Sequence, residues 1–279
     1  MVTTVVRDSW RPHPLAWIHR AEAGAIAGEL RRAGRPINVA IFSEDALSGL
    51  PPGPLLLRLS DSVMLRATRA LEQASIAYIG PSAAAMERCY DKYEASRIVA
   101  ARGVSCPATA LAHEADAIPR PLVLKPRRGS DSIGVRLVAN GAIPARWCNA
   151  DHIAQEQVRG TELTVGVFRG RAGMPLRIDL PEGVPYSFAR KYVLRPRSSP
   201  LVEGELARRI RSAALEVAGI LGADWAVRID LMIETASGRL RFLECDVAPL
   251  VGVGSAFAAS LAAAGVAREE QLRLLLGEK

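Results

Sequence analysis

Three carboxylates near the C-terminal end of the sequence have a spacing that indicates chemistry. Asp230 ends an apolar, strand-like run (AVRID), and Glu244 and Asp246 end a second one (RLRFLECD). If these runs pair as a hairpin around Ser237–Gly238, the three acids meet at one end of a sheet, with Glu244 and Asp246 on the same face. Carboxylates that converge repel one another, and magnesium binds one or two of them together with phosphate oxygens. The hairpin therefore predicts a magnesium site; solvated surface acids are the alternative.

A second group of residues is suited to phosphate. In PLVLKPRRGSDSIGV, Lys125 ends a strand and a small, polar, glycine-rich loop with Ser130 and Ser132 follows it. Such a loop lets backbone N–H groups close over phosphate oxygens, while the lysine supplies a point charge. The Walker P-loop pattern is absent, and a plain hairpin with a serine-rich turn is the alternative. Arg228, on the same strand as Asp230, could face a developing oxyanion.

Composition narrows the classes of function. The 279-residue chain has a formal net charge of +7, but its arginines are spread through every segment and aromatics are only 5% of residues. Nucleic-acid binding, which needs clustered basic and stacking residues, is therefore disfavoured, and a basic cleft for an anionic substrate such as a nucleotide is the better interpretation.

The sequence shows no pattern typical of a membrane span, a signal peptide, a disulfide framework or a zinc site. No run approaches the roughly 18 apolar residues of a membrane span, and the start lacks the pattern of a signal peptide. The four cysteines are far apart and fit neither a disulfide framework nor a zinc site. We expect a cytoplasmic protein with no membrane partner.

The first 80 residues must position part of the site, because strands and helices alternate along them. Strands are expected at 3–7, 37–42 and 55–59, and helices at 16–33 and 63–73, which predicts a small parallel α/β sheet. Groups at the carboxyl ends of such strands face the ligand cleft. Three polar residues after the first strand are therefore candidate substrate contacts: Asp8, Arg11 and His13. A polar surface loop is the alternative.

After residue 80 the predicted elements no longer follow the regular strand–helix alternation. Pro81 can open a helix that runs to about Arg102. Short strands, glycine loops and hairpins follow, broken by a helix at 202–221 and closed by apolar helices from about Ser255. We expect three domains, at 1–84, 85–158 and 159–279.

Six motifs in order give the chain a family resemblance. They are DKYEASRIVAARGVSCPAT, LVLKPRRGSDSIGV, QEQVRGTELTVGV, ARKY, VRIDLMI and LECDVAPLVGVGS. Together they resemble the ATP-grasp ligases of the D-alanine–D-alanine ligase branch, over roughly residues 85 to 276. The resemblance implies an α/β (α+β) ATP-grasp fold, with an N-terminal parallel α/β domain, a small central domain and a C-terminal antiparallel-sheet domain. ATP would lie between the last two.

The resemblance also implies roles for individual residues. Lys92 and Lys125 match phosphate-contacting lysines, and Ser130 and Ser132 fall in the loop over the γ-phosphate. Gln155, Glu156 and Val158 match the hinge beside the adenine, and Glu162 matches the acid that holds the ribose. Lys191 resembles the lysine of a loop that closes over the reacting groups, Arg228 the arginine that stabilises the tetrahedral intermediate, and Ser255 the residue that holds the second amino acid's carboxylate. Asp230, Glu244 and Asp246 match ligands of two magnesium ions, for which manganese could substitute.

Three departures from the family concern the substrate. Asp246 replaces the usual asparagine, Leu250 replaces a glycine, and the N-terminal part lacks the glycine-rich loop and glutamate that anchor the first D-alanine. From the resemblance we expect a Mg-ATP-dependent carboxylate–amine ligase that acts on a small amino acid through an acyl phosphate and that forms a homodimer. Because of the departures, we expect it to act in a specialised, antibiotic-type pathway. The alternatives are an intramolecular cyclo-ligase of the D-cycloserine-forming kind and a non-catalytic nucleotide-binding protein.

Overall fold

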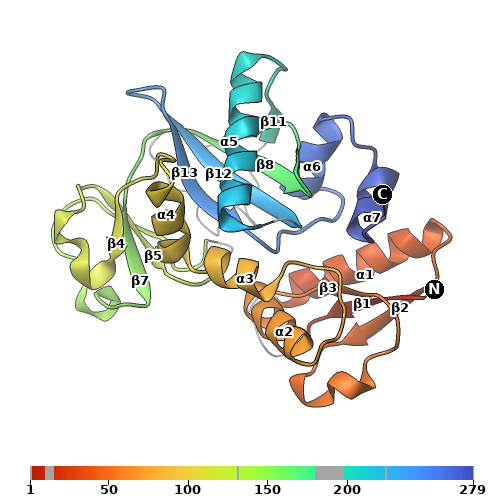
Figure 1. The fold of residues 1–279 in the computed structure, drawn as a ribbon. Coiled ribbons are helices and arrows are strands. Elements are labelled where there is room, and N and C mark those ends of the chain that lie inside the picture. The colour runs from red at the N-terminus through yellow and green to blue at the C-terminus, as the bar shows by residue number, and fades with distance from the viewer. Residues whose placement is uncertain (1, 10–15, 131, 180–197, 224, 279) are drawn as a thin grey trace.

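The computed structural model describes residues 2–9, 16–130, 132–179, 198–223 and 225–278. Within these residues the strands form one parallel sheet and two antiparallel sheets (Figure 1). The expected change from parallel to antiparallel pairing along the chain is therefore confirmed.

The parallel sheet comes from the first 60 residues. Its order is β2-β1-β3, with β1 at Thr3–Arg7, β2 at Ile37–Ile41 and β3 at Leu55–Arg58. Helices α1 (Ala16–Arg32) and α2 (Asp61–Gln73) accompany it, and a 3-10 helix, η1 (Glu44–Gly49), lies between β2 and β3. The β-branched run of β1 favours a strand.

The single helix expected from 81 to 102 is wrong. The structure has two helices there, α3 (Ala83–Tyr90) and α4 (Lys92–Ala101), separated by Asp91. Asp91 has an extended backbone, and its side chain accepts a hydrogen bond from the backbone N–H of Glu94. This N-cap satisfies an otherwise unpaired helical N–H and starts a new helix in a new direction.

The four-stranded antiparallel sheet forms the smaller lobe of the molecule. Its order is β4-β7-β5-β6, and its bounds are Thr109–Leu111 for β4, Leu122–Pro126 for β5, Arg136–Val138 for β6 and His152–Glu156 for β7. Two 3-10 helices, η2 (Ala112–Ala117) and η3 (Ala145–Trp147), complete this lobe. The lobe has a small hydrophobic core, to which η2 contributes.

The six-stranded antiparallel sheet forms the centre. Its order is β11-β10-β8-β12-β13, with β9 paired to β8. The strands are β8 (Gly160–Phe168), β9 (Arg171–Ala172), β10 (Leu176–Ile178), β11 (Ser198–Pro200), β12 (Ala226–Glu234) and β13 (Leu240–Asp246). Helix α5 (Glu205–Leu221) packs on this sheet. It begins three residues later than expected, because Gly204 is its N-cap and Val202 is 90% exposed.

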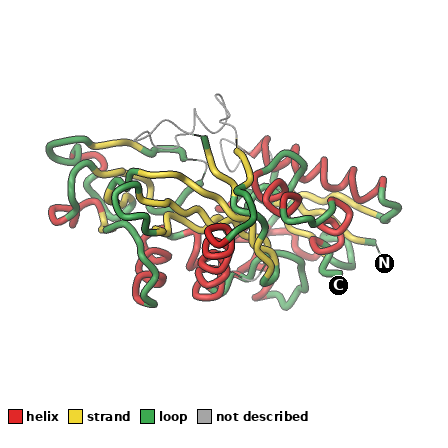
Figure 2. Tube along the Cα trace, turned by 90° about the horizontal axis from the view of Figure 1, so that it is seen from above, coloured by secondary structure: helices red, strands yellow, loops and turns green. Residues whose placement is uncertain are grey.

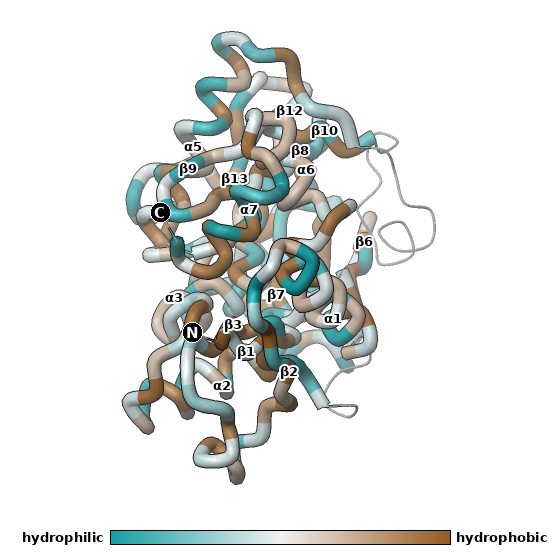
Figure 3. Tube along the Cα trace, turned by 90° about the vertical axis from the view of Figure 1, so that its right-hand side faces the viewer, coloured by the Kyte–Doolittle hydropathy of each residue, from teal (hydrophilic) through white to brown (hydrophobic). Residues whose placement is uncertain are grey.

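Helices α6 (Ala256–Ala263) and α7 (Arg268–Leu275) close the chain. The molecule is elongated, and both termini lie at the same end (Figures 1 and 2). Hydrophobic and hydrophilic stretches alternate along the helical tubes, as expected for helices with one buried face (Figure 3). Of the described helices, none is long and apolar enough to span a membrane.

The largest core cluster joins the parallel sheet to the central sheet. It includes Leu57 of β3, Met64 of α2, Met86 of α3, Val165 of β8 and Val217 of α5. Because one cluster crosses from the N-terminal part to the central sheet, the carboxyl end of β3 is held close to the carboxylate-bearing strands.

Candidate functional site

A cavity of about 380 Å³ lies between the two antiparallel sheets. Strands β5 and β7 supply one wall, and β8, β10, β12 and β13 supply the other. The volume is in the range of small-molecule sites. All but three of the described site residues expected from the sequence line it: Lys92, Lys125, Ser130, Ser132, Gln155, Glu156, Val158, Glu162, Arg228, Asp230 and Glu244.

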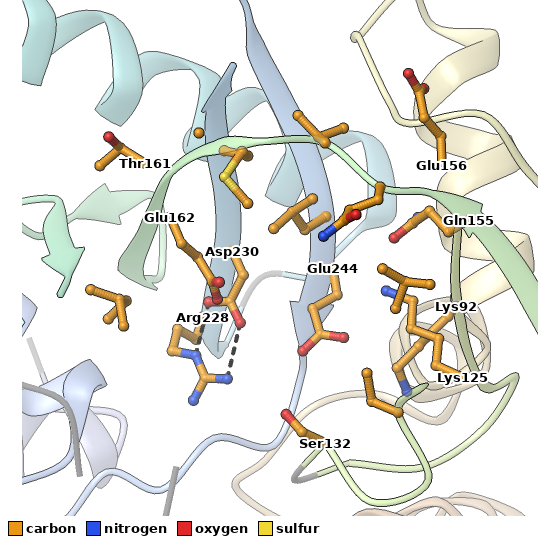
Figure 4. A pocket seen from close by; sticks show the side chains of 18 of the residues that line it. Lys92, Lys125, Ser132, Gln155, Glu156, Thr161, Glu162, Arg228, Asp230 and Glu244 are labelled. Atoms are coloured by element: carbon orange, nitrogen blue, oxygen red, sulfur yellow. Dashed lines mark hydrogen bonds and ion pairs between the residues drawn. The ribbon is translucent and has the colours of Figure 1, made fainter. Parts of the chain in front are cut away.

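One end of the cavity carries the predicted acids around a buried arginine. Arg228 Nε and Nη2 lie 3.0 and 3.1 Å from the two carboxylate oxygens of Asp230, and Nη1 lies 3.3 Å from Asp246 (Figure 4). The expected hairpin is confirmed, with Arg228 opposite Asp246 and Asp230 opposite Glu244. Thr164 of β8 donates a further hydrogen bond of 2.7 Å to Asp230. Burial alone would lower the pKa of Arg228, but Asp230 and Asp246 hold it well above its ordinary value.

Glu162 lies beside this group, on β8. Its strand position is opposite Met232 of β12, two residues beyond Asp230. Burial, together with the negative charges of Asp230 and Glu244, raises the pKa of Glu162 to about 8, although Arg228 and Lys125 oppose the shift. In the ligand-free chain at neutral pH this carboxyl group is therefore largely protonated.

Two lysines come from different elements. Lys125 is the penultimate residue of β5 and is 8% exposed, and Lys92 begins α4. Burial lowers the pKa of Lys125, while Glu244 opposes that shift. Lys92 donates from Nζ to the carbonyl oxygen of Gly129, in the glycine-rich loop. The structure thus brings both cations to the loop that the sequence marks for phosphate.

The backbone of that loop needs its small residues. Gly129, Ser132 and Gly134 have φ values of 140°, 57° and 77°. A Cβ atom at Gly134 would lie 2.9 Å from Pro126, so a side chain there would force the loop to move. This close approach is the reason that a glycine follows the serines.

Alternation along β7 separates two residues of the expected hinge. The Gln155 side chain is buried and donates to Thr109 at 3.0 Å. The Glu156 side chain turns away from the other labelled residues (Figure 4) and pairs with Arg241 at 2.9 Å. Glu156 can therefore line the cavity through its backbone, and its carboxylate ties β7 to β13.

The donor set fits magnesium shared with a ligand. Among the described residues, no three His, Cys, Asp or Glu side chains form a complete metal site. Asp230 and Glu244 face each other across β12 and β13, and Asp246 lies at the end of β13. Mg²⁺ is commonly held by one or two carboxylates plus substrate phosphates, so this partial set suits an ion whose other ligands arrive with the nucleotide.

The remaining candidates lie outside the cavity or outside the described residues. Asp8 is fully buried and accepts hydrogen bonds from the backbone N–H (2.9 Å) and hydroxyl (3.3 Å) of Ser60, so its carboxylate joins the ends of β1 and β3. Ser255 caps α6 by accepting from the N–H of Ala258 at 3.1 Å. Three further candidates fall outside the described residues: Arg11, His13 and Lys191.

The sequence analysis missed a buried ion pair behind the site. Arg58 of β3 donates to Glu22 of α1 at 2.7 and 3.1 Å and to the carbonyl oxygen of Pro249 at 2.7 Å. The other Glu22 oxygen accepts from the N–H groups of Val251 and Gly252. The pair thus fixes the turn that follows Asp246. No local pattern signals it, because the partners are far apart in the sequence.

A smaller cavity of about 30 Å³ adjoins the carboxylate end. It shares Lys92, Arg228 and Glu244 with the large cavity, and Asp61 and Tyr90 also line it. Burial, together with the negative charge of Asp61, raises the pKa of Tyr90 to about 12.

Comparison with known proteins gives two kinds of match in sequence. An ATP-grasp domain model matches residues 89–234. The chain is 30% identical to the D-alanine–D-alanine ligase of Nitrosospira multiformis over 224 residues, which cover 75% of this chain and 72% of that protein. It is 28% identical to the D-alanine–D-alanine ligase of Acidiphilium cryptum over 247 residues, which cover 83% and 77%.

Solved structures share the fold. The D-alanine–D-alanine ligase of Bacillus anthracis complexed with ATP superposes with a TM-score of 0.82 at 18% identity, covering 99% of this chain and 96% of that one. The VanG D-Ala:D-Ser ligase of Enterococcus faecalis gives 0.78 at 17% identity, covering 99% and 98%. At these identities the structural matches show a shared fold. The sequence match at 30% identity, which covers more than two thirds of each chain, shows the family. The chain therefore belongs to the ATP-grasp family, in its D-alanine–D-alanine ligase branch.

Proposed function

We propose that this ADP-forming, ATP-dependent ligase joins the carboxylate of a small amino acid, or of an amino-acid derivative, to an amine, through an acyl phosphate. The observation that carries the proposal is that one cavity holds two lysines and a glycine-rich loop together with Arg228, Asp230 and Glu244. Phosphoryl transfer needs positioned cations, and acyl transfer needs a positive group at the developing oxyanion.

Each group has a place in the reaction. Lys92, Lys125 and the loop residues bind the phosphates, and Glu162 accepts from the ribose hydroxyls. The substrate carboxylate attacks the γ-phosphorus and ADP leaves; the amine then attacks the acyl carbon and inorganic phosphate leaves with the carboxylate oxygen. Arg228 stabilises the tetrahedral intermediate of the second step. Asp230, Glu244 and Asp246 would hold magnesium, which when bound neutralises charge on the transferring phosphoryl group.

The small cavity supports a small substrate. Its 30 Å³ lies against Arg228 and Glu244, where the reacting carboxylate would meet the amine, and its described walls leave space for a group no larger than an ammonium or methyl. Leu250, where the family has glycine, lies in the turn after Asp246. The cavity therefore favours a small amino acid, and the proposal of a specialised substrate rests on the sequence departures at Asp246, Leu250 and the N-terminal part.

The test is a screen of ADP release with ATP, magnesium and a panel of L- and D-amino acids and their derivatives. Product masses then distinguish intermolecular ligation from cyclisation. A dipeptide has the mass of two substrate molecules minus one water, whereas a cyclised product has the mass of one substrate molecule minus one water. If Mg-ATP binds but no ADP is released with any member of the panel, the result would favour the non-catalytic alternative.

A further inference from the structure

We propose that Asp91 is a positioning residue that fixes the glycine-rich loop and Lys92 in the arrangement that binds the ATP phosphates. The inference rests on the proposed phosphate-binding role of the loop. It assigns a function to the residue that divides α3 from α4, which the reaction itself does not use.

The contacts of Asp91 lead to the start of the loop. Its carboxylate, 2% exposed as a residue, accepts from Arg127 Nε at 2.8 and 2.9 Å and from Arg128 Nη2 at 2.9 Å. It also accepts from the backbone N–H of Glu94 at 3.2 Å. One carboxylate therefore joins the first turn of α4 to the two residues that follow β5.

Backbone contacts reinforce the same junction. Asp91 and Arg128 form an isolated antiparallel bridge, and the N–H of Lys92 donates to the carbonyl oxygen of Arg127 at 2.9 Å. The Lys92 side chain donates to the carbonyl oxygen of Gly129. Lys92 and the loop are thus held in register with each other through Asp91 and its neighbours.

The charge arrangement points the same way. Arg127 and Arg128 do not line the large cavity, whereas Lys92 does. Burial alone would raise the pKa of Asp91, but hydrogen bonds from Arg127 and from the N–H of Glu94, with the charges of Arg127 and Arg128, hold it below its ordinary value. Through these hydrogen bonds Asp91 holds both guanidinium groups beside its own carboxylate, outside the large cavity, and leaves the phosphate contacts to the lysines.

The variant Asp91→Asn removes the charge and keeps the shape. Asparagine is as good an N-cap as aspartate, so α4 should still form. The charge-assisted hydrogen bonds to two arginines are weakened, which loosens the loop. We expect affinity for ATP to fall about tenfold, and affinity for adenosine, which lacks phosphates, to stay within about twofold of the wild-type value.

The experiment measures both affinities by calorimetry on the full chain, with magnesium and without an amino acid. Arg127→Ala removes the other partner and is a second route if Asp91→Asn does not fold. In the double variant the two losses should not add, because both break one interaction. Glu94→Gln is the matched control: it lies on the same helix and removes an exposed pair with Arg97.

The outcomes separate the inference from the function on which it rests. A tenfold loss for ATP alone, shared by Arg127→Ala and absent from Glu94→Gln, supports it. Equal losses for ATP and adenosine would reduce Asp91 to a folding role and overturn it, and so would unchanged ATP affinity in both variants. If the wild-type chain bound ATP no more tightly than adenosine, the phosphate site and the inference would both be wrong.

Discussion

Replacing Arg228 by alanine should destabilise the chain strongly, because a single buried cation holds two carboxylates. The Arg228 side chain is 12% exposed, and its partners Asp230 and Asp246 are 10% and 19% exposed. Breaking a buried pair by removing one partner costs about 3–5 kcal/mol, since the remaining charge is buried without compensation. At roughly 2–4 °C per kcal/mol for a chain of this size, the melting temperature should fall by about 10 °C.

Thermal unfolding at neutral pH, followed by calorimetry with and without millimolar magnesium, measures this effect. Magnesium should stabilise Arg228→Ala more than the wild-type protein, because the ion replaces the lost positive charge among the three carboxylates. The matched control is Arg69→Ala, whose pair with Glu87 is about half exposed and should contribute less than about 1 kcal/mol. If Arg228→Ala unfolds within about 1 kcal/mol of the wild-type protein, the buried cluster does not have the energetics assigned to it.

Further predictions concern other parts of the cavity. The folded-state pKa of Glu162, about 8, lies above its unfolded value, so the stability contributed by the protonated carboxyl is lost as pH rises toward 8, by up to about 1.4 kcal/mol per pH unit. Urea unfolding at pH 5 and pH 8.5 should therefore show a smaller pH effect in Glu162→Gln, and parallel profiles would contradict the shift. Glu244→Ala should lower kcat at least about a thousandfold and still fold, because this acid is placed to hold magnesium against the phosphates; wild-type turnover would exclude it as a metal ligand. Gly160→Ala should destabilise the protein, since a Cβ there would lie 1.9 Å from the carbonyl oxygen of Ile233; an unchanged urea midpoint would mean that the strands separate easily at this point.

The sequence correctly placed in the site those residues that lie on regular strands, because the position of a residue along a strand determines the face on which its side chain lies. Asp230 lies in the middle of β12 and not at its end, and it pairs with Glu244 because the two residues are equally distant in sequence from Ser237 in the turn. Lys125 lies in its strand as expected, although the strand extends one residue further, to Pro126. Alternation along a strand and a short hairpin are local properties, and a sequence reports them directly.

The sequence analysis was wrong or incomplete where a side chain forms a contact that the local pattern had not predicted. Asp91 interrupts the expected long helix, although the pattern of aspartate followed three residues later by Glu94 is a known N-terminal signature and could have revealed it. The outward side chain of Glu156 depends on Arg241, which lies 85 residues away in the sequence. The Glu22–Arg58 pair likewise joins segments that no local pattern connects. Such long-range partners are set by the fold and are not readable from spacing.

The central claim is that a substrate carboxylate is activated by phosphorylation, and an oxygen-isotope measurement tests it most directly. The amino acid that stimulates ADP release most strongly is supplied with ¹⁸O in its carboxylate, and the released phosphate is analysed by mass spectrometry. One labelled oxygen should appear in each phosphate, because the carboxylate oxygen that attacks the γ-phosphorus leaves with it. Unlabelled phosphate released while the amide forms would mean that the carboxylate oxygen left by another path, and would contradict the acyl-phosphate route.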